Sequence, residues 1–245
     1  MVGPRSPCSA VQGRLLGKLR RWSRRWQQLR GGERVAIGLS GGLDSLATVQ
    51  LLAAHRRTLA GGLELTALHV RLDSEGRSSG LPETTAAWCR ELGVGLEEVD
   101  PRLDPAEELP LDCHRCAKAR RRTLLEAADA RGCTHLALGH HADDVVDTWV
   151  LSLFYTGTAE VIPPVRSYFG GVVTVVRPLY ELRRQEIRRL ADRCGFPPLP
   201  TPCPGEEHAR RDRVRAVLAA LGRDEKRVRR QLFWAAMRQL EADAE

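Results

Sequence analysis

The sequence predicts an α/β fold: a doubly wound, mostly parallel sheet flanked by helices, with helical extensions at both ends. The first observation is the stretch 34–45, RVAIGLSGGLDS, where a short apolar run gives way to small residues and then to a helical pattern. The second is that further apolar runs, at 63–72, 94–99 and 134–140, are separated by segments with helical spacing. Strands that alternate with helices favour a parallel sheet.

The loop between the first strand and its helix predicts an anion site. Gly41 and Gly42 allow the backbone to approach a phosphate closely, and the positive end of the following helix faces the same point. Hydroxyls of Ser40 and Ser45 add donors, and Asp44 can hold a divalent cation against the phosphates. The loop is neither a Walker A nor a Rossmann sequence. A Ser/Gly turn without a ligand is the simpler alternative, and the strand–loop–helix context disfavours it.

Composition narrows the class of protein. With 245 residues the chain can form one sizeable α/β domain plus appended helices. It has no apolar run long enough to span a bilayer and no continuous apolar segment near its start, so neither a membrane anchor nor a secretory signal is expected. Seven irregularly spaced cysteines indicate free thiols in a reducing cytoplasm. A net charge of +7 fits a polyanionic partner.

The two ends of the chain are basic and helical. Residues 11–29 place tryptophans and leucines at helical spacing with arginines between them, and these tryptophans either dock the helix onto the domain or stack on RNA. Arg-rich helices are expected at 181–194, 206–221 and 224–242. We therefore expect three parts: an N-terminal helix (1–32), a nucleotide-binding domain (33–195) and a C-terminal segment (196–245).

Polar residues gather where the predicted strands end, which is where doubly wound sheets bind nucleotides. Asp73 follows the second strand, and a solvated loop aspartate is its simpler interpretation. The strand at 134–140 leads into His140, His141, Asp143 and Asp144. The two carboxylates either cap the next helix or act near a magnesium ion. The histidines are either acid–base groups or hydrogen-bonded structural residues.

Two cysteines open a basic helix over 113–131. Cys113 and Cys116 lie on one helix face, where the helix dipole favours thiolates. The pair could be half of a zinc site, a redox dithiol, two ligands of an iron–sulfur cluster, or two small buried residues. A third cysteine, Cys203, lies in a proline-rich segment at 195–205, which lowers the entropic cost of fixing its position.

Seven motifs occur along the chain: SGGLDS, CHRC, LALGHHADDVVDT, FYTG, IPP, VVRPL and PxPxPC. They follow one another in the same order as in the tRNA 2-thiocytidine synthetases, which this chain resembles from about Gly13 to Trp234. That family belongs to the PP-loop N-type ATP pyrophosphatases. The resemblance implies the adenine nucleotide alpha hydrolase fold. It also implies a sulfurtransferase that adenylates the C2 oxygen of cytidine 32 in tRNA and replaces that oxygen with sulfur.

The resemblance also implies cofactors and partners. ATP and Mg²⁺ would be held by Ser40, Gly41, Gly42, Asp44, Ser45, His140 and Asp143, with Asp44 on the metal. A 4Fe–4S cluster would be held by Cys113, Cys116 and Cys203, which together with Asp44 form the catalytic set. The expected partners are tRNA and a sulfur donor such as the persulfide of a cysteine desulfurase, and a homodimer is left open.

Three departures from the family pattern leave the substrate open. No second cysteine follows Cys203 closely, Leu43 occupies a loop position often taken by a cation, and the segment after the second strand is short. A divergent paralogue acting on another tRNA base, a lysidine-type synthetase and a non-catalytic RNA- or ATP-binding module are the alternatives. The three cysteines disfavour lysidine-type chemistry, and the intact Ser40 and Asp44 disfavour a non-catalytic module.

Overall fold

The computed structural model describes residues 7–73, 80–101, 103, 108–198 and 206–243, and at its centre lies a six-stranded sheet in the order β3-β2-β1-β4-β6-β5. Its strands are β1 (Arg34–Gly38), β2 (Glu64–Val70), β3 (Gly95–Val99), β4 (His135–Ala137), β5 (Val165–Tyr168) and β6 (Val173–Val176). All pairings are parallel except that of the edge strand β5 with β6. The predicted doubly wound α/β class is confirmed.

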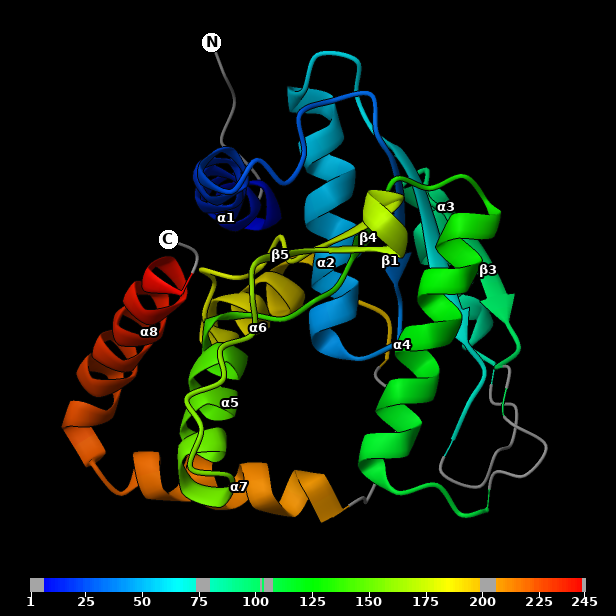
Figure 1. Cartoon of the computed structure of the whole chain (residues 1–245). Coiled ribbons are helices and arrows are strands. Elements are labelled where there is room, and N and C mark those ends of the chain that lie inside the picture. Colours follow the sequence, from blue (N-terminus) through cyan, green and yellow to red (C-terminus); the bar gives the residue numbers. More distant parts are fainter. Residues whose placement is uncertain (1–6, 74–79, 102, 104–107, 199–205, 244–245) are drawn as a thin grey trace, which may run out of the picture.

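Helices cover both faces of this sheet and extend beyond it (Figure 1). They are α1 (Pro7–Arg25), α2 (Leu43–His55), α3 (Glu83–Glu91), α4 (Cys113–Ala130), α5 (Ala142–Tyr155), α6 (Arg184–Cys194), α7 (Glu206–Ala219) and α8 (Glu225–Ala242), with 3₁₀ turns at Arg56–Thr58, Phe169–Gly171 and Gly222–Asp224. None of the described helices combines the length and apolar character that a membrane crossing requires.

Side chains of β1 alternate between two apolar layers. Val35 and Ile37 pack with residues of α2 and α3, whereas Ala36 packs with residues of α4 on the opposite face. All three side chains are fully buried. Burial on both faces explains why the strand appears in the sequence as a continuous apolar run rather than an alternating one.

The order of the strands fixes where a ligand site can form. From β1 the chain moves through α2 to β2, on one side of β1, whereas β4 pairs with β1 on its other side. The loops that follow β1 and β4 therefore diverge at the centre of the sheet, and such a switch point leaves a crevice at the carboxyl ends of the strands. The SGGLDS loop and the histidine–aspartate segment both lie there.

The N-terminal helix docks onto the domain through its tryptophans. Trp22 is 2% exposed and stacks on Tyr180, with ring centroids 5.1 Å apart and an interplanar angle of 10°. The helix ends at Arg25, short of the predicted residue 29, and Gln27 adopts a positive φ of 49° just beyond it. The docking interpretation is confirmed for Trp22, because its buried ring is not accessible to an RNA base.

One pair of cysteines departs from the expectation of free thiols. Cys8 of α1 forms a disulfide with Cys194 at the end of α6. The two residues are 186 positions apart in the sequence, and the packing of α1 against α6 brings them together. Cys89, Cys113, Cys116 and Cys133 form no disulfide among the described residues.

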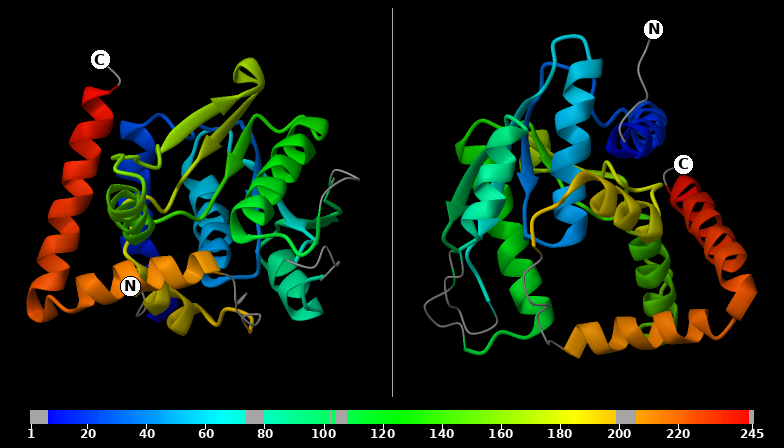
Figure 2. Two further views of the ribbon diagram at one scale, coloured as in Figure 1. Left: turned by 60° about the horizontal axis from the view of Figure 1, so that its bottom comes forward. Right: turned by 180° about the vertical axis from the view of Figure 1, so that it is seen from behind.

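The C-terminal helices α7 and α8 wrap around α5, as both views in Figure 2 show. Their charged contact is the Asp147 cluster, which consists of Asp147, Arg215 and Arg229. Asp147 lies on the buried face of α5, and its side chain is 1% exposed. Its carboxylate accepts from Nε of Arg215 on α7 and from Nη1 of Arg229 on α8, both at 2.8 Å. One buried carboxylate thus holds both helices.

We expect Asp147→Asn to destabilise the fold by about 3–5 kcal/mol, because the substitution removes the one buried charge that Arg215 and Arg229 share and leaves them only their more exposed partners. The free energy of unfolding from urea titration measures this loss.

Asp212→Asn is the matched control. Asp212 also pairs with Arg215, at 3.1 Å, but its side chain is 65% exposed, so the change should be within about 0.5 kcal/mol. Equal losses in the two variants would contradict the role of the buried carboxylate.

Candidate functional site

The SGGLDS loop joins the end of β1 to the first turn of α2. Gly41 is buried and has a φ of +80°, a backbone conformation that L side chains rarely adopt. Ser45 is also buried, whereas Ser40 is exposed. The loop thus opens toward solvent at the positive end of α2, which is the geometry of a phosphate site.

Hydrogen bonds within the loop hold its hydroxyl groups in place. Oγ of Ser45 donates to the carbonyl of Gly42 at 2.7 Å and lies 3.2 Å from Oγ of Ser40. The backbone N–H of Gly42 donates to Ser40 Oγ at 3.3 Å. The loop is therefore preorganised, and the two hydroxyl groups are positioned at its mouth.

A second loop packs against the first through a glycine. A Cβ atom on Gly139 would lie 2.8 Å from the carbonyl oxygen of Asp44 and 3.0 Å from Oγ1 of Thr48, closer than real Cβ contacts allow. Only glycine lets the loop after β4 approach the first turn of α2 this closely. Gly139 is a functional position that the sequence analysis missed.

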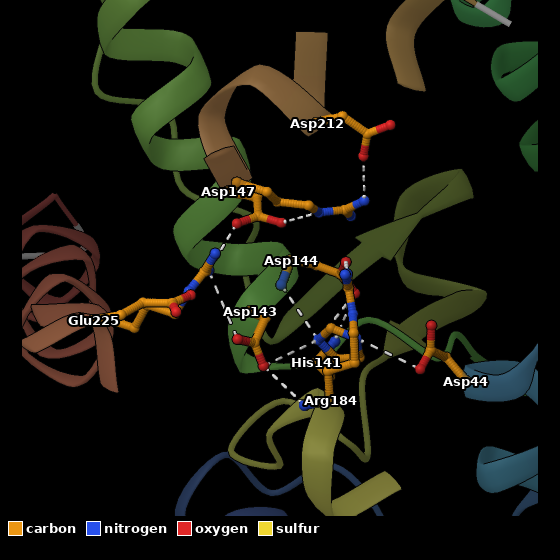
Figure 3. A network of polar contacts seen from close by, with 10 residues as sticks. Asp44, His141, Asp143, Asp144, Asp147, Arg184, Asp212 and Glu225 are labelled. Carbon is orange, nitrogen blue, oxygen red and sulfur yellow. Dashed lines mark hydrogen bonds and ion pairs between the residues drawn. The ribbon is translucent and has the colours of Figure 1, made fainter. Parts of the chain in front are cut away.

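His141 links the two loops (Figure 3). Its imidazole is fully buried, and its Nδ1 accepts from the backbone N–H of Asp144 at 3.3 Å. Because that N–H can only donate, Nδ1 carries the lone pair and a neutral ring carries its proton on Nε2. Nε2 faces Oδ1 of Asp44 at 3.5 Å. The sequence left His141 open as an acid–base group or a structural residue, and the geometry makes it a helix cap whose second ring nitrogen faces Asp44.

Asp44 fits a cation site. Its Oδ1 is buried and has no hydrogen-bond partner among the described residues, although the side chain as a whole is 38% exposed. Burial raises the pKa of the Asp44 carboxyl above its ordinary value, and the facing His141 opposes that rise. A carboxylate that is short of partners at the mouth of a phosphate loop is suited to Mg²⁺, which usually takes one or two carboxylates together with phosphate oxygens.

The two aspartates after His141 cap helices. Asp144 accepts from the backbone N–H of His141 at 3.1 Å and completes a capping box at the start of α5. Asp143 accepts from the backbone N–H of Arg184 at 2.8 Å, and so caps α6 rather than its own helix. Its other oxygen lies 3.6 Å from Nη1 of Arg229. The expected cap of the next helix is confirmed for Asp144, whereas Asp143 caps a different helix from the one predicted, and a magnesium role stays a prediction for both.

His140 lies beside a buried arginine. Its Nδ1 accepts from Nε of Arg177 at 3.3 Å, and Arg177 is 5% exposed. Burial lowers the pKa of His140 to about 3, and the positive charge of Arg177 adds to this effect. The side chain is therefore neutral at physiological pH. These contacts favour the structural alternative for His140, and its predicted contact with the nucleotide stays a prediction.

The CxxC pair opens α4. Cys113 is half-buried, Cys116 is 9% exposed, and the preceding Asp112 caps the helix by accepting from the backbone N–H of Arg115 at 2.8 Å. Cys203 lies outside the described residues. Within the described residues no three His, Cys, Asp or Glu side chains converge to hold a metal ion. The four alternatives for the pair therefore remain open.

The other free cysteines are poor candidates for chemistry. Cys89 is fully buried, and burial raises the pKa of its thiol to about 11. Cys133 is 6% exposed, and burial raises its pKa as well. Buried thiols of raised pKa are weak nucleophiles and weak metal ligands.

Comparisons with known proteins identify relatives over most of the chain. A family model described as a PP-loop domain matches residues 18–221. The chain is 30% identical to the tRNA-cytidine(32) 2-sulfurtransferase of Syntrophotalea carbinolica over 239 residues, which cover 92% of this chain and 90% of the relative. It is 33% identical to the protein of the same name from Geobacter sulfurreducens, with 84% and 82% covered.

Solved structures share the fold. The U34-tRNA thiolase NcsA from Methanococcus maripaludis, solved with its 4Fe–4S cluster, superposes with a TM-score of 0.77 at 24% identity, covering 95% of this chain and 80% of that one. NAD⁺ synthetase from Burkholderia pseudomallei gives a TM-score of 0.52 at 20% identity, with 97% and 92% covered. At these identities the likeness concerns the fold alone.

The half-buried His140 predicts that the stability of the fold depends on pH. Its pKa falls from an ordinary value of 6.5 to about 3 in the fold, so below pH 6.5 the unfolded chain takes up a proton that the folded chain does not. The stability that this neutral histidine contributes is present above pH 6.5 and is lost as the pH falls toward 3. Between pH 6.5 and 4 the free energy of unfolding of His140→Asn should therefore fall less steeply with falling pH than that of the unchanged protein. The difference between the two slopes should reach about 1.4 kcal/mol per pH unit.

Urea titrations at several pH values measure this slope. The asparagine oxygen can still accept from Arg177, so the variant keeps the hydrogen bond. His114→Asn, at an exposed position of α4, is the control and should keep the slope of the unchanged protein. An unaltered slope in His140→Asn would show that this histidine is not the titrating group.

Proposed function

Because this chain belongs to the PP-loop family, and within it to the family of the tRNA-cytidine(32) 2-sulfurtransferases, we propose that it uses ATP to replace an oxygen of a tRNA base with sulfur. The family expected from the sequence motifs is confirmed. The chain is accordingly an enzyme of the transferase class. The base is cytidine 32, at its C2 position, as the names of these relatives and the motif resemblance support.

One observation carries the proposal: the SGGLDS loop and the carboxylates after β4 converge at the switch point of the sheet. Asp44 lies at the mouth of a glycine-rich loop, at the start of a helix, with His141 behind it. That arrangement suits a nucleotide whose phosphates need both N–H donors and a metal ion.

We assign the predicted residues to three tasks. The phosphates of ATP bind to the loop and to the start of α2, Mg²⁺ binds to Asp44, and the segment after β4 borders the rest of the nucleotide. The residues are Ser40, Gly41, Gly42 and Ser45 for the phosphates, and His140 and Asp143 for the border. Rigid placement of the pyrophosphate supplies positioning and charge stabilisation, on which phosphoryl and adenylyl transfers depend.

The chemistry balances in two steps. The C2 oxygen of the base attacks the α-phosphate of ATP, the bond to the β-phosphate oxygen breaks, and pyrophosphate leaves. Sulfide sulfur then adds to C2, the C2–O bond breaks, and AMP leaves with the former base oxygen on its phosphate. The product is 2-thiocytidine, and no electrons are exchanged with the base.

A 4Fe–4S cluster held by Cys113, Cys116 and Cys203 is the second part of the proposal. Thiolates are the ligands that such clusters use, and α4 presents two cysteines at its start. Helix α7, which begins at Glu206 shortly after Cys203, contacts α4, and Figures 1 and 2 show the first turns of the two helices side by side. When bound, such a cluster supplies a soft metal site that can hold sulfur.

Several further assignments are part of the same proposal. The sulfur comes from a donor such as the persulfide of a cysteine desulfurase, whose outer sulfur is released as sulfide when a dithiol supplies two electrons and is itself oxidised to a disulfide. The protein works in the cytoplasm, where tRNA is modified. We also propose domain boundaries that divide the chain into residues 1–32, 33–195 and 196–245. The question of a homodimer is left open.

Asp44→Asn should abolish the reaction. The amide keeps the size of the side chain but removes the charge that holds Mg²⁺, and loss of a preorganised contact to developing charge costs about 10²–10³ in rate. Purified protein is incubated with tRNA, ATP, Mg²⁺ and sulfide, and the measurements are pyrophosphate release and 2-thiocytidine by mass spectrometry of tRNA nucleosides.

Asp129→Asn is the matched control, at an exposed position near the far end of α4. It should react like the unchanged protein. Absence of 2-thiocytidine with unchanged protein would exclude the proposed reaction, and full activity of Asp44→Asn would exclude the proposed role of Asp44.

The proposed cluster can be tested through the colour and the iron content of the protein. Anaerobically purified protein should be brown and contain about four irons per chain. Cys203→Ser and Cys113→Ser should lose the colour and the iron, whereas Cys89→Ser, at a buried thiol of raised pKa, should keep both. Iron analysis and the visible absorption spectrum measure this. A protein that holds only zinc would rule out the cluster.

A further inference from the structure

A cavity lies beside the start of α5, where Ala142 and Asp143 line it. It has a volume of about 460 Å³ and is lined by residues of α1, α5, α6, α7 and α8 and of the turn before α6. This volume is in the range of sites for small ligands. No motif of the sequence analysis pointed to it, because its walls come from five helices far apart in the chain.

The walls of this cavity are strongly basic. Eight cationic side chains line it, from Lys18 on α1 to Arg230 on α8, against the three carboxylates of Asp143, Glu181 and Glu225. Like charges so close together repel one another, and an anion bound beside those cations that lack a carboxylate partner would relieve this repulsion.

Four of the eight cations are already paired with carboxylates, and their positions are fixed by those pairs. Arg215 and Arg229 belong to the Asp147 cluster, and Lys18 pairs with Glu186 at 3.0 Å. Arg184 lies 3.6 Å from Asp144. These side chains form a rigid positive wall.

The other four cations have no acidic partner among the described residues. They are Arg183, Arg188, Lys226 and Arg230. Arg188 on α6 and both Lys226 and Arg230 on α8 are exposed, and they approach the cavity from two different helices. They are free to contact a bound anion.

The cavity also has an apolar part. Half-buried Trp234 supplies its accessible apolar surface, and the ring of Trp234 packs edge-on against that of the buried Phe233 at 5.3 Å. A site for inorganic phosphate alone needs no such surface. A ligand that joins phosphates to flat, apolar bases uses both kinds of wall.

The cavity borders the candidate active site. Asp143 lines it, caps α6, and is adjacent to Asp144 and close to His141, which faces Asp44 (Figure 3). A strand that lies in the cavity therefore passes the N-terminal end of α5, directly beside the loop that faces the nucleotide site.

We propose that this cavity binds the phosphate backbone of an RNA strand, and so guides the substrate toward the site at the switch point. The proposal rests on the proposed function, because it locates part of the tRNA surface. The arginines in the middle of α4 are weaker candidates. Arg120 already donates to the carbonyl of Leu72, and Arg122 pairs with Glu126 at 2.7 Å.

The test compares two triple variants of the full chain. The cavity variant carries Arg188→Gln, Lys226→Gln and Arg230→Gln. The control variant carries Arg189→Gln, Arg223→Gln and Arg238→Gln, which are exposed residues on or next to the same helices, lie outside the cavity lining and have no acidic partner among the described residues. Both variants lose three positive charges, so they differ only in where on the protein those charges are lost.

Fluorescence anisotropy with labelled tRNA, without ATP, gives the affinity at several salt concentrations. The cavity variant should bind at least about tenfold more weakly at 0.1 M salt, with a log–log salt slope shallower by about two to three, since each phosphate contact contributes about 0.7–0.9. The control variant should stay close to the unchanged protein. Calorimetric binding of ATP should be the same in all three proteins.

Each other outcome has a defined meaning. If both triple variants bind tRNA equally more weakly, or if the cavity variant binds it as tightly as the unchanged protein, the cavity is not the RNA site, while the proposed function stands. Failure of the unchanged protein to bind tRNA overturns the proposed function and the cavity with it. If AMP alone binds and the cavity variant loses that binding, the site is one for a mononucleotide, and the inference of an RNA strand is wrong.

Discussion

The close packing of the loop after β1 against the loop after β4 is the constraint on which the candidate site depends. It requires glycine at position 139, because any Cβ there would collide with the backbone of Asp44. It also requires a residue that can cap α5 and reach Asp44, and His141 does both with its two ring nitrogens. Since β1 and β4 are paired strands, the register of the sheet brings these groups together before any ligand binds.

Charged contacts extend from this point into the helices outside the sheet. Asp143 ties the start of α5 to the start of α6 and lies near Arg229 of α8. One turn further along α5, Asp147 holds both Arg215 and Arg229. Three of the helices that line the basic cavity, α6, α7 and α8, are therefore fixed to the same short stretch of α5 that lies beside the loop facing Asp44.

Much of the fold and part of the site could be predicted from the sequence, because patterns within short stretches of the chain indicate them. The strand, glycine-rich loop and helix over 34–55 are as predicted, and so is the placement of the histidines and aspartates after β4. The edge strand β5 was missed, because VRSY is short and mostly exposed, and its pairing with β6 defines it. Cys203 lies outside the described residues, so the cluster stays a prediction.

Other features are set by contacts between distant parts of the chain, which no local pattern shows. The Cys8–Cys194 disulfide and the basic cavity are of this kind. Asp147 is an intermediate case. A lone carboxylate among Val145, Val146 and Val150 on an apolar helix was a signal that a buried partner exists, although the sequence did not say that the partners would be arginines from two C-terminal helices.

The disulfide between α1 and α6 divides the molecule topologically. It closes residues 8–194 into a covalent ring that contains the whole sheet, the SGGLDS loop and the CxxC pair. Everything after Cys194 is a tail outside that ring, and its helices are held to it by the Asp147 cluster. Cys203 lies on the stretch between the covalent closure and this ionic attachment. A proteolytic cut within the ring would leave its fragments linked, whereas a cut between residues 195 and 205 would leave α7 and α8 attached only by non-covalent contacts.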